Sequence, residues 1–289
     1  MKIAIASGKG GTGKTFVSTN LFELARMQGR QVSLADCDAE EPNVAEFLRG
    51  KETSGSKVFQ HVPVIDPEKC TFCGKCFEYC NYNAILFLPD NRFIQVIPDL
   101  CHDCGACQAA CRDGAITERE KLLGTVKAFR TDEKAWLVES RSEVGVYSPV
   151  KIIKQAIREA GRQPLCLMDS PPGISCPFIA TVDPADYVVL VTEPTPFGLN
   201  DLKLSAETVE QLGKPFGVVI NRAGLGSDMV HRWLKEKQIP LLLEIPFDRD
   251  IARIYSEGKI LVQENPHYRN IFKQLLNSIE AKYSLWQKS

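Results

Sequence analysis

Residues 8–15 read Gly8-Lys9-Gly10-Gly11-Thr12-Gly13-Lys14-Thr15, and this stretch decides the fold. It fits the pattern G-x-x-x-x-G-K-[ST], follows an apolar run over 2–6, and precedes an amphipathic segment over about 14–28 that Gly29 ends. A strand, a glycine-rich loop and a helix in this order are typical of a phosphate-binding loop. The stretch therefore predicts an α/β fold of the P-loop NTPase class, with a doubly wound, mostly parallel sheet.

The loop also predicts how a nucleotide would be bound. The backbone N–H groups of residues 8–15 form a nest at the start of a helix, which stabilises phosphate oxygens. We expect Lys14 to reach the β- and γ-phosphates and to act in catalysis, and the Thr15 hydroxyl to bind Mg²⁺.

Two further apolar runs end in carboxylates. The strand expected over 31–35 leads into Asp36 and Asp38, and the strand over 164–168 leads into Asp169. Because α/β sheets bind ligands beyond the carboxyl ends of their strands, we expect these side chains beside the phosphate loop. Runs over 187–191, 216–220 and 241–246 predict the remaining strands.

Lys9 indicates a narrower resemblance. A lysine this early in the loop resembles the deviant Walker A motif of the MinD, ParA and nitrogenase iron-protein class. That resemblance implies an ATPase that forms an ATP-dependent homodimer, in which Lys9 contacts the partner's phosphates and contributes to catalysis. The alternative is a lysine that only contacts solvent at the loop.

The same resemblance assigns roles to the other polar positions. Asp38 would orient or deprotonate the attacking water, and Asp36 and Asp169 would support Mg²⁺. The N–H of Gly173, which follows Asp169 in the second switch segment, would sense the γ-phosphate.

The adenine site is implied by the segments after the last two strands. Asn221 would hydrogen-bond the base, with Arg222 beside it, and the segment from Pro246 to Asp248 would line the base. A capping role for Asn221 at the start of the next segment is the alternative.

Eight of the 11 cysteines fall between residues 70 and 111, in two runs of the form C-x2-C-x2-C-x3-C. Gly74 of the first run recurs as Gly105 of the second, so the segment is an internal duplication. Three thiolates two residues apart can surround one face of an iron–sulfur cluster. Zinc sites or disulfides are the alternative, although zinc favours paired C-x2-C motifs.

The runs resemble those of bacterial two-cluster ferredoxins, in which the fourth cysteine of each run ligates the other cluster. The resemblance implies one [4Fe–4S] cluster on Cys70, Cys73, Cys76 and Cys111, and a second on Cys101, Cys104, Cys107 and Cys80. Seven acidic residues stand against four basic ones over 61–117. This excess suits either a face that attracts a basic redox partner or an ordinary solvated surface.

The two motifs predict an interrupted domain. We expect a P-loop ATPase domain over 1–60 and 118–289, with an α+β ferredoxin-like domain inserted over 61–117. The polar residues 51–57 are interpreted as the linker that leads into the insertion, and 117–130 as the polar return. The whole chain resembles MinD-superfamily ATPases that carry an inserted ferredoxin domain.

Three cysteines remain. Cys37 and Cys166 are expected to be small core residues. Cys176 lies at an offset from Asp169 at which the nitrogenase iron protein has a cluster ligand, which implies a metal site at the dimer interface. Simple packing of Cys176 is the alternative.

Composition limits the remaining function classes. The formal net charge is −1, so the chain lacks the basic excess that would bind nucleic acid. No apolar run spans a bilayer and the N-terminus lacks a secretory signal, so we expect a cytoplasmic protein. The apolar positions over 268–286 predict a terminal helix packed on the sheet, with membrane docking as the alternative.

Three functions are consistent with this sequence. The leading hypothesis is an iron–sulfur ATPase that couples ATP hydrolysis to electron transfer through two clusters to an unidentified redox partner. The second is an assembly factor that delivers a cluster or metal to a client metalloprotein. The third is a MinD-like positioning switch with redox-sensing clusters.

Overall fold

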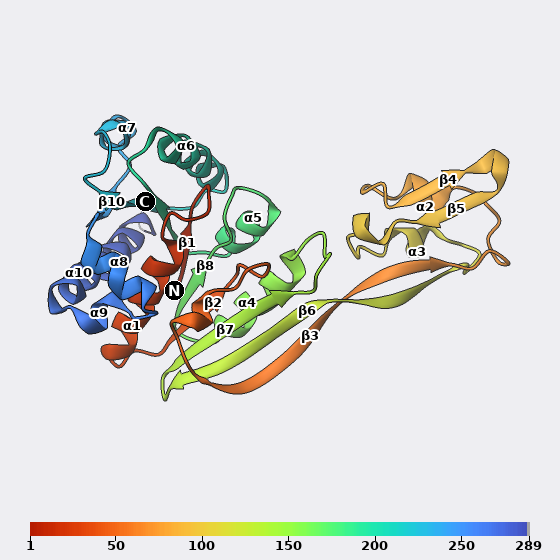
Figure 1. The fold of residues 1–289 in the computed structure, drawn as a ribbon. Helices are drawn as coiled ribbons and strands as arrows, with labels where there is room; N and C mark the ends of the chain where they lie inside the picture. Colours follow the sequence, from red (N-terminus) through yellow and green to blue (C-terminus); the bar gives the residue numbers. More distant parts are fainter. Residues whose placement is uncertain (288–289) are drawn as a thin grey trace. The chain divides into compact units, whose positions relative to one another are not determined.

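The computed structural model describes residues 1–287 and divides into two compact units (Figure 1). Unit 1 comprises Met1–Ser56, Thr125–Arg141 and the part of the chain from Ser148 onward. Unit 2 comprises Lys57–Gly124 and Ser142–Tyr147. The insertion proposed over 61–117 falls within the first segment of unit 2.

Unit 1 is built on a mostly parallel sheet, as the sequence predicted. The strand order of the whole sheet is β11-β10-β9-β1-β8-β2-β7-β6-β3, and the pairs from β11 through to β7 are parallel. The strands are β1 (Lys2–Ala6), β2 (Val32–Asp36), β3 (Lys51–Ile65), β6 (Ile116–Asp132), β7 (Ala135–Ser142), β8 (Leu165–Asp169), β9 (Tyr187–Thr192), β10 (Phe216–Ala223) and β11 (Leu241–Pro246).

Helices cover both faces of this sheet. They are α1 (Lys14–Met27), η1 (Val44–Glu46), α4 (Val150–Ala160), α5 (Cys176–Val182), α6 (Pro196–Gln211), α7 (Met229–Glu236), α8 (Arg249–Ser256), α9 (Leu261–Glu264) and α10 (Pro266–Trp286). Alternate strand residues such as Ile3 and Leu167 join one core with α1, α8, α9 and α10. The other face meets α4, where Ser33 Oγ donates to Ala160 O at 2.7 Å. Successive side chains of each strand point to opposite faces of the sheet, and both faces are covered by helices.

The two segments interpreted as linkers are strands instead. Residues 51–57 open β3, and 117–130 lie in β6. The first part of β3 is exposed, which explains its polar sequence, and cross-strand contacts hold it: Thr53 Oγ1 donates to Ala128 O at 3.0 Å, and Lys127 pairs with Glu52 at 3.2 Å. Because this part of β3 is exposed to solvent, its polar composition resembles that of a loop.

Unit 2 repeats its backbone as well as its cysteines. It contains α2 (Lys75–Glu78), α3 (Ala106–Ala110), and an antiparallel pair of β4 (Ile85–Leu88) and β5 (Phe93–Val96). Left-handed residues recur at matching positions of the two runs: Phe72 with Asp103, Gly74 with Gly105, and Asn83 with Gly114. The duplicated sequence therefore folds as a duplicated loop, turn and short helix.

The C-terminal helix α10 packs on the core of unit 1. Phe272, Leu275, Leu276 and Ile279 are buried, whereas Leu285 near its end is 68% exposed. The spacing of these residues produces one buried stripe, as predicted. Within residues 1–287, no helix has the length and apolar character required to cross a membrane.

Candidate functional site

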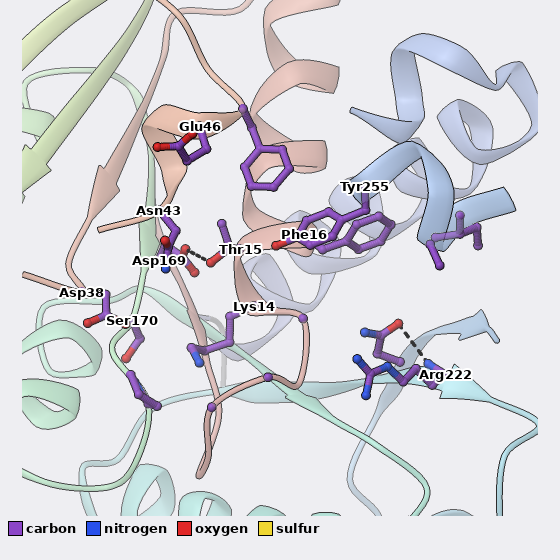
Figure 2. Close-up of a pocket in the computed structure, with 18 of the residues that line it drawn as sticks. Lys14, Thr15, Phe16, Asp38, Asn43, Glu46, Asp169, Ser170, Arg222 and Tyr255 are labelled. Atoms are coloured by element: carbon purple, nitrogen blue, oxygen red, sulfur yellow. Dashed lines mark hydrogen bonds between the residues drawn. The ribbon is translucent and has the colours of Figure 1, made fainter. Parts of the chain in front are cut away.

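The carboxyl ends of the parallel strands surround a cavity of about 740 Å³ in unit 1 (Figure 2). This volume lies within the range of small-molecule sites, roughly 300–1,000 Å³. The predicted residues that line it are Gly10, Gly11, Gly13, Lys14, Thr15, Asp36, Asp38, Asp169, Asn221, Arg222, Pro246 and Asp248. Sequence segments far apart in the chain therefore meet at one edge of the sheet.

The phosphate loop depends on glycine at its end. Gly13 has a φ of +99°, which favours glycine, and a Cβ at this position would collide with the Asn221 amide. That amide donates from Nδ2 to Thr12 O at 2.9 Å, and its Oδ1 accepts from Arg222 N at 2.9 Å. Asn221 therefore binds the loop itself; it does not cap α7, which begins eight residues later at Met229 after Asp228.

Two carboxylates lie at the carboxyl ends of the neighbouring strands β2 and β8. Asp36 and Asp169 are partners in the ladder between β2 and β8. Thr15 Oγ1 donates to Asp169 Oδ2 at 2.7 Å, while Asp169 Oδ1 is buried without a hydrogen-bond partner (Figure 2). Asp36 accepts from Val44 N at 3.0 Å and from Asp38 N at 3.2 Å.

This arrangement fits a hydrated divalent cation. Burial raises the pKa of Asp169 to about 6, and burial together with the Asp169 charge raises the pKa of Asp36. A buried carboxylate oxygen with no partner, beside a hydroxyl, is a donor set that Mg²⁺ would satisfy. Thr15, Asp36 and Asp169 are therefore the residues that could hold Mg²⁺.

Lys14 and Asp38 lie on the same side of the cavity. The Lys14 side chain is buried and extends toward Asp38 and Ser170 (Figure 2), and its Nζ donates to Lys9 O at 3.4 Å. Burial lowers the pKa of Lys14, and the negative charges of Asp169 and Asp38 offset only part of this decrease. Burial also raises the pKa of Asp38, which makes its carboxylate a better proton acceptor near neutral pH.

Lys9 is not among the residues that line the cavity. Its Nζ lies 3.3 Å from Glu193 Oε2, and Arg222 donates from Nη1 to Glu193 Oε1. Glu193 follows β9 directly and is buried. Glu193 was not among the site residues predicted from the sequence, although an acidic residue at the carboxyl end of a central strand was a usable signal.

Aromatic side chains form part of the cavity wall, and the sequence analysis missed them too. Phe47, after η1, stacks on Tyr255 of α8 with ring centroids 4.7 Å apart, and Phe16 meets Tyr255 edge to face at 5.7 Å. All three line the cavity. Such a wall offers an apolar surface to a flat ligand such as a nucleobase.

The other predicted nucleotide-binding residues lie outside the cavity lining: Gly8, Lys9, Thr12 and Gly173. The Gly173 N–H donates to Ser7 O at 3.2 Å, so contact with a γ-phosphate would require this hydrogen bond to break. Cys176 is exposed at the first position of α5. Cys37 and Cys166 are buried, in line with the expected packing role.

In unit 2 the eight cysteines line two separate small cavities. One is lined by Cys70, Cys73, Cys76 and Cys111, and the other by Cys80, Cys101, Cys104 and Cys107. Each cavity thus takes its fourth cysteine from the other run, which is the grouping implied by the resemblance to two-cluster ferredoxins. Within residues 1–287, no three His, Cys, Asp or Glu side chains are gathered closely enough for a single metal ion.

Protons would compete with a metal group for several of these thiols. Burial raises the pKa of Cys76, Cys101 and Cys107, that of Cys107 to about 11, so each would carry a proton unless a cation displaces it. Backbone N–H groups already face sulfur, since Ala84 N donates to Cys80 Sγ at 3.3 Å. Such hydrogen bonds stabilise cluster-bound thiolates.

Comparison with known proteins places this chain in a family. The CobQ/CobB/MinD/ParA nucleotide binding domain model matches residues 3–262. The chain is 32% identical to the uncharacterized protein MJ0579 of Methanocaldococcus jannaschii, across 96% of this chain and 97% of that protein. It is 23% identical to the cytosolic Fe-S cluster assembly factor NUBP2 of Mus musculus, across 91% and 84%. The septum site-determining protein MinD of Pyrococcus horikoshii, solved with Mg-ADP, shares the fold with a TM-score of 0.59 and 20% identity, across 95% and 93%. The chain therefore belongs to the CobQ/CobB/MinD/ParA nucleotide-binding family.

Proposed function

We propose that this protein is an MgATP-dependent ATPase that assembles or delivers iron–sulfur clusters. One observation carries the proposal: a single chain combines the nucleotide cavity of unit 1 with two four-cysteine cavities in unit 2. The similarity to a cytosolic Fe-S cluster assembly factor supports delivery over the electron-transfer function that the sequence analysis favoured.

In the proposed reaction, unit 1 hydrolyses ATP. Lys14 would neutralise the β- and γ-phosphates, and Asp38 would orient the attacking water and accept its proton. Thr15, Asp36 and Asp169 would hold Mg²⁺, which supplies charge neutralisation when bound. A homodimer would complete the site through Lys9 of the second copy.

In unit 2 the two cysteine sets would hold [4Fe–4S] clusters. The clusters would supply low-potential one-electron chemistry when bound. The exposed thiol of Cys176 is the proposed transfer point in unit 1, since two copies of the chain would bring two such thiols to a dimer interface. The client would be a protein that binds the same kind of cluster.

ATP-gated electron transfer is the second candidate function. Each cysteine cavity takes a ligand from both runs, so removal of either cluster would disturb both halves of the duplication. This interlocked arrangement favours clusters that stay in place as redox centres.

An anaerobic transfer assay separates the two candidates. The reconstituted protein is mixed with an apo-enzyme that needs a [4Fe–4S] cluster, with and without MgATP, and activation of the apo-enzyme is followed. Delivery predicts MgATP-dependent activation that Lys14→Ala reduces at least about tenfold while iron stays bound. Cys176→Ser should also block activation but leave ATP hydrolysis intact, and Cys166→Ala, which removes a buried thiol, is the matched control.

Three other results of this assay would contradict parts of the delivery proposal. Activation that is equal with and without MgATP would refute ATP-driven delivery. If the clusters instead remain on the protein and their electron paramagnetic resonance signals change with MgATP, the electron-transfer function replaces delivery. Unchanged activation by Cys176→Ser would remove Cys176 from the pathway.

A further inference from the structure

Glu193 forms ion pairs with two cations from different segments, one in the phosphate loop and one at the end of β10. Its Oε2 lies 3.3 Å from Lys9 Nζ in the phosphate loop, and its Oε1 accepts from Arg222 at the end of β10. The Glu193 side chain is 10% exposed, whereas Lys9 is 31% and Arg222 is 51% exposed. The carboxylate is therefore the fixed member of the triad, and the two cations are the members that can move.

The two cations differ in their relation to the cavity. Arg222 lines it and Lys9 does not. The main chain of Lys9 is held in place, since Lys9 O accepts from Ser7 Oγ at 2.6 Å and from Lys14 Nζ at 3.4 Å. Lys9 is absent from the cavity lining, and Glu193 is the ion-pair partner of its side chain.

The Arg222 contact connects the same carboxylate to the base side of the cavity. Arg222 has a φ of +54°, a conformation that non-glycine residues adopt rarely and only with support. This conformation follows Asn221, whose amide donates to Thr12 O. Glu193 thus supports the turn that braces the end of the phosphate loop while it also holds Lys9 near the loop's start.

We propose that Glu193 is a positioning residue that holds the Lys9 side chain outside the cavity until a nucleoside triphosphate competes for it. This inference rests on the proposed ATPase function. When nucleotide binds and the proposed dimer forms, Lys9 exchanges one carboxylate for phosphate oxygens of the nucleotide bound by the second copy, and part of the phosphate binding energy is used to break the Lys9–Glu193 pair. Glu193 thus influences nucleotide affinity through Lys9, without itself contacting the reacting atoms.

A double-mutant cycle on the full-length protein tests this role. Glu193→Gln removes the charge but keeps the shape, so we expect a non-hydrolysable ATP analogue with Mg²⁺ to bind about two- to fivefold more tightly by calorimetry. In a Lys9→Met background the same substitution should leave the dissociation constant unchanged within error. Glu159→Gln, which removes a carboxylate paired with Arg162 elsewhere in unit 1, is the matched control and should have no effect.

The outcomes distinguish this inference from the function on which it rests. A gain that persists in the Lys9→Met background would show a general charge effect and overturn the role. Equal or weaker binding by Glu193→Gln would overturn it as well. If the wild-type protein fails to bind the analogue, both the proposed ATPase function and this inference fall. Should Glu193→Gln fail to fold, Glu193→Asp, which keeps the charge but withdraws it from Lys9 by shortening the side chain, should also tighten binding of the analogue and should lose that gain in the Lys9→Met background.

Discussion

Asp169 shows at the scale of one residue why the site is built for a cation. One of its oxygens accepts from Thr15 and the other is buried without a partner. A buried carboxylate with an unsatisfied oxygen is costly, because burial favours its neutral form. The free protein therefore keeps a destabilising group whose cost a bound Mg²⁺ would offset.

This cost predicts a pH dependence of stability. The pKa of Asp169 is raised from 3.8 to about 6, so the folded protein holds this proton more tightly than the unfolded chain does. The contribution of Asp169 to the free energy of unfolding must then fall as pH rises from about 4 to about 6, and stay lower above that range. Asp169→Asn should raise the free energy of unfolding at pH 7 by about 1–3 kcal/mol without Mg²⁺.

Chemical denaturation at pH 4 and pH 7 measures this effect as the difference in the free energy of unfolding between the wild-type protein and Asp169→Asn. The difference should be small at pH 4 and largest at pH 7, and Mg²⁺ should reduce it by stabilising the wild-type protein only. A difference that does not change with pH would contradict the raised pKa.

The site residues that belong to sequence motifs could be predicted. The residues that join the site only through tertiary contacts could not. Lys14, Thr15 and Asp169 could be placed together, because the carboxyl ends of parallel strands share one edge. The stacking of Phe47 on Tyr255 could not, because it arises where η1 and α8 meet in space. Glu193 follows a predicted strand, but its two cationic partners become visible only in the folded chain.

At the scale of elements, the two halves of unit 2 share a backbone but not an environment. Gly74 and Gly105 have φ of +75° and +71° at the start of α2 and α3. A Cβ on Gly74 would lie 2.8 Å from Phe87 Cε1, whereas a Cβ on Gly105 would meet nothing within 4 Å. The duplication therefore supplies a matched pair of substitutions.

We predict that Gly74→Ala disturbs its cluster site more than Gly105→Ala does. Alanine in the left-handed region costs about 1–2 kcal/mol at either position, and at Gly74 the Phe87 ring must move as well. Iron analysis after anaerobic reconstitution should give about eight irons per chain for Gly105→Ala, as for two full clusters, and a clear deficit for Gly74→Ala. Equal iron loss in both variants would refute the predicted asymmetry.

The strands β3 and β6 show where elements are hard to predict. Much of β3 is exposed, so its sequence lacks the alternation that a half-buried strand shows. Its pairing partner, β6, lies far away in sequence, and only that pairing makes a strand of residues that read as a linker. The strands of the buried centre, by contrast, read as apolar runs and were predicted well.

At the scale of the whole molecule, the two units differ in what stabilises them. The core of unit 1 gathers aliphatic and aromatic side chains from its strands and from α1, α8, α9 and α10. Around the cysteines of unit 2, one hydrophobic cluster contains Cys76, Ile85 and Ile116 as its buried members, with Cys80, Cys107 and Cys111 among the side chains packed against it. So few buried side chains give little hydrophobic stabilisation to the segment that carries the cysteines, so the proposed iron–sulfur clusters would contribute much of its stability.

Iron removal should therefore unfold unit 2 and leave unit 1 folded. We expect the iron-loaded protein to lose the structure of unit 2 when a chelator removes iron under reducing conditions, while a cooperative thermal transition of unit 1 persists. MgADP at about 100 times its dissociation constant should stabilise that remaining transition by about 2.7 kcal/mol, because it would bind only the folded nucleotide-binding unit 1. Calorimetry with and without MgADP, together with limited proteolysis to locate the cleaved segment, measures both effects. Cleavage confined to 57–124 and 142–147 would agree with the division into units, whereas loss of the MgADP-sensitive transition on chelation would show that unit 1 also needs the clusters to fold.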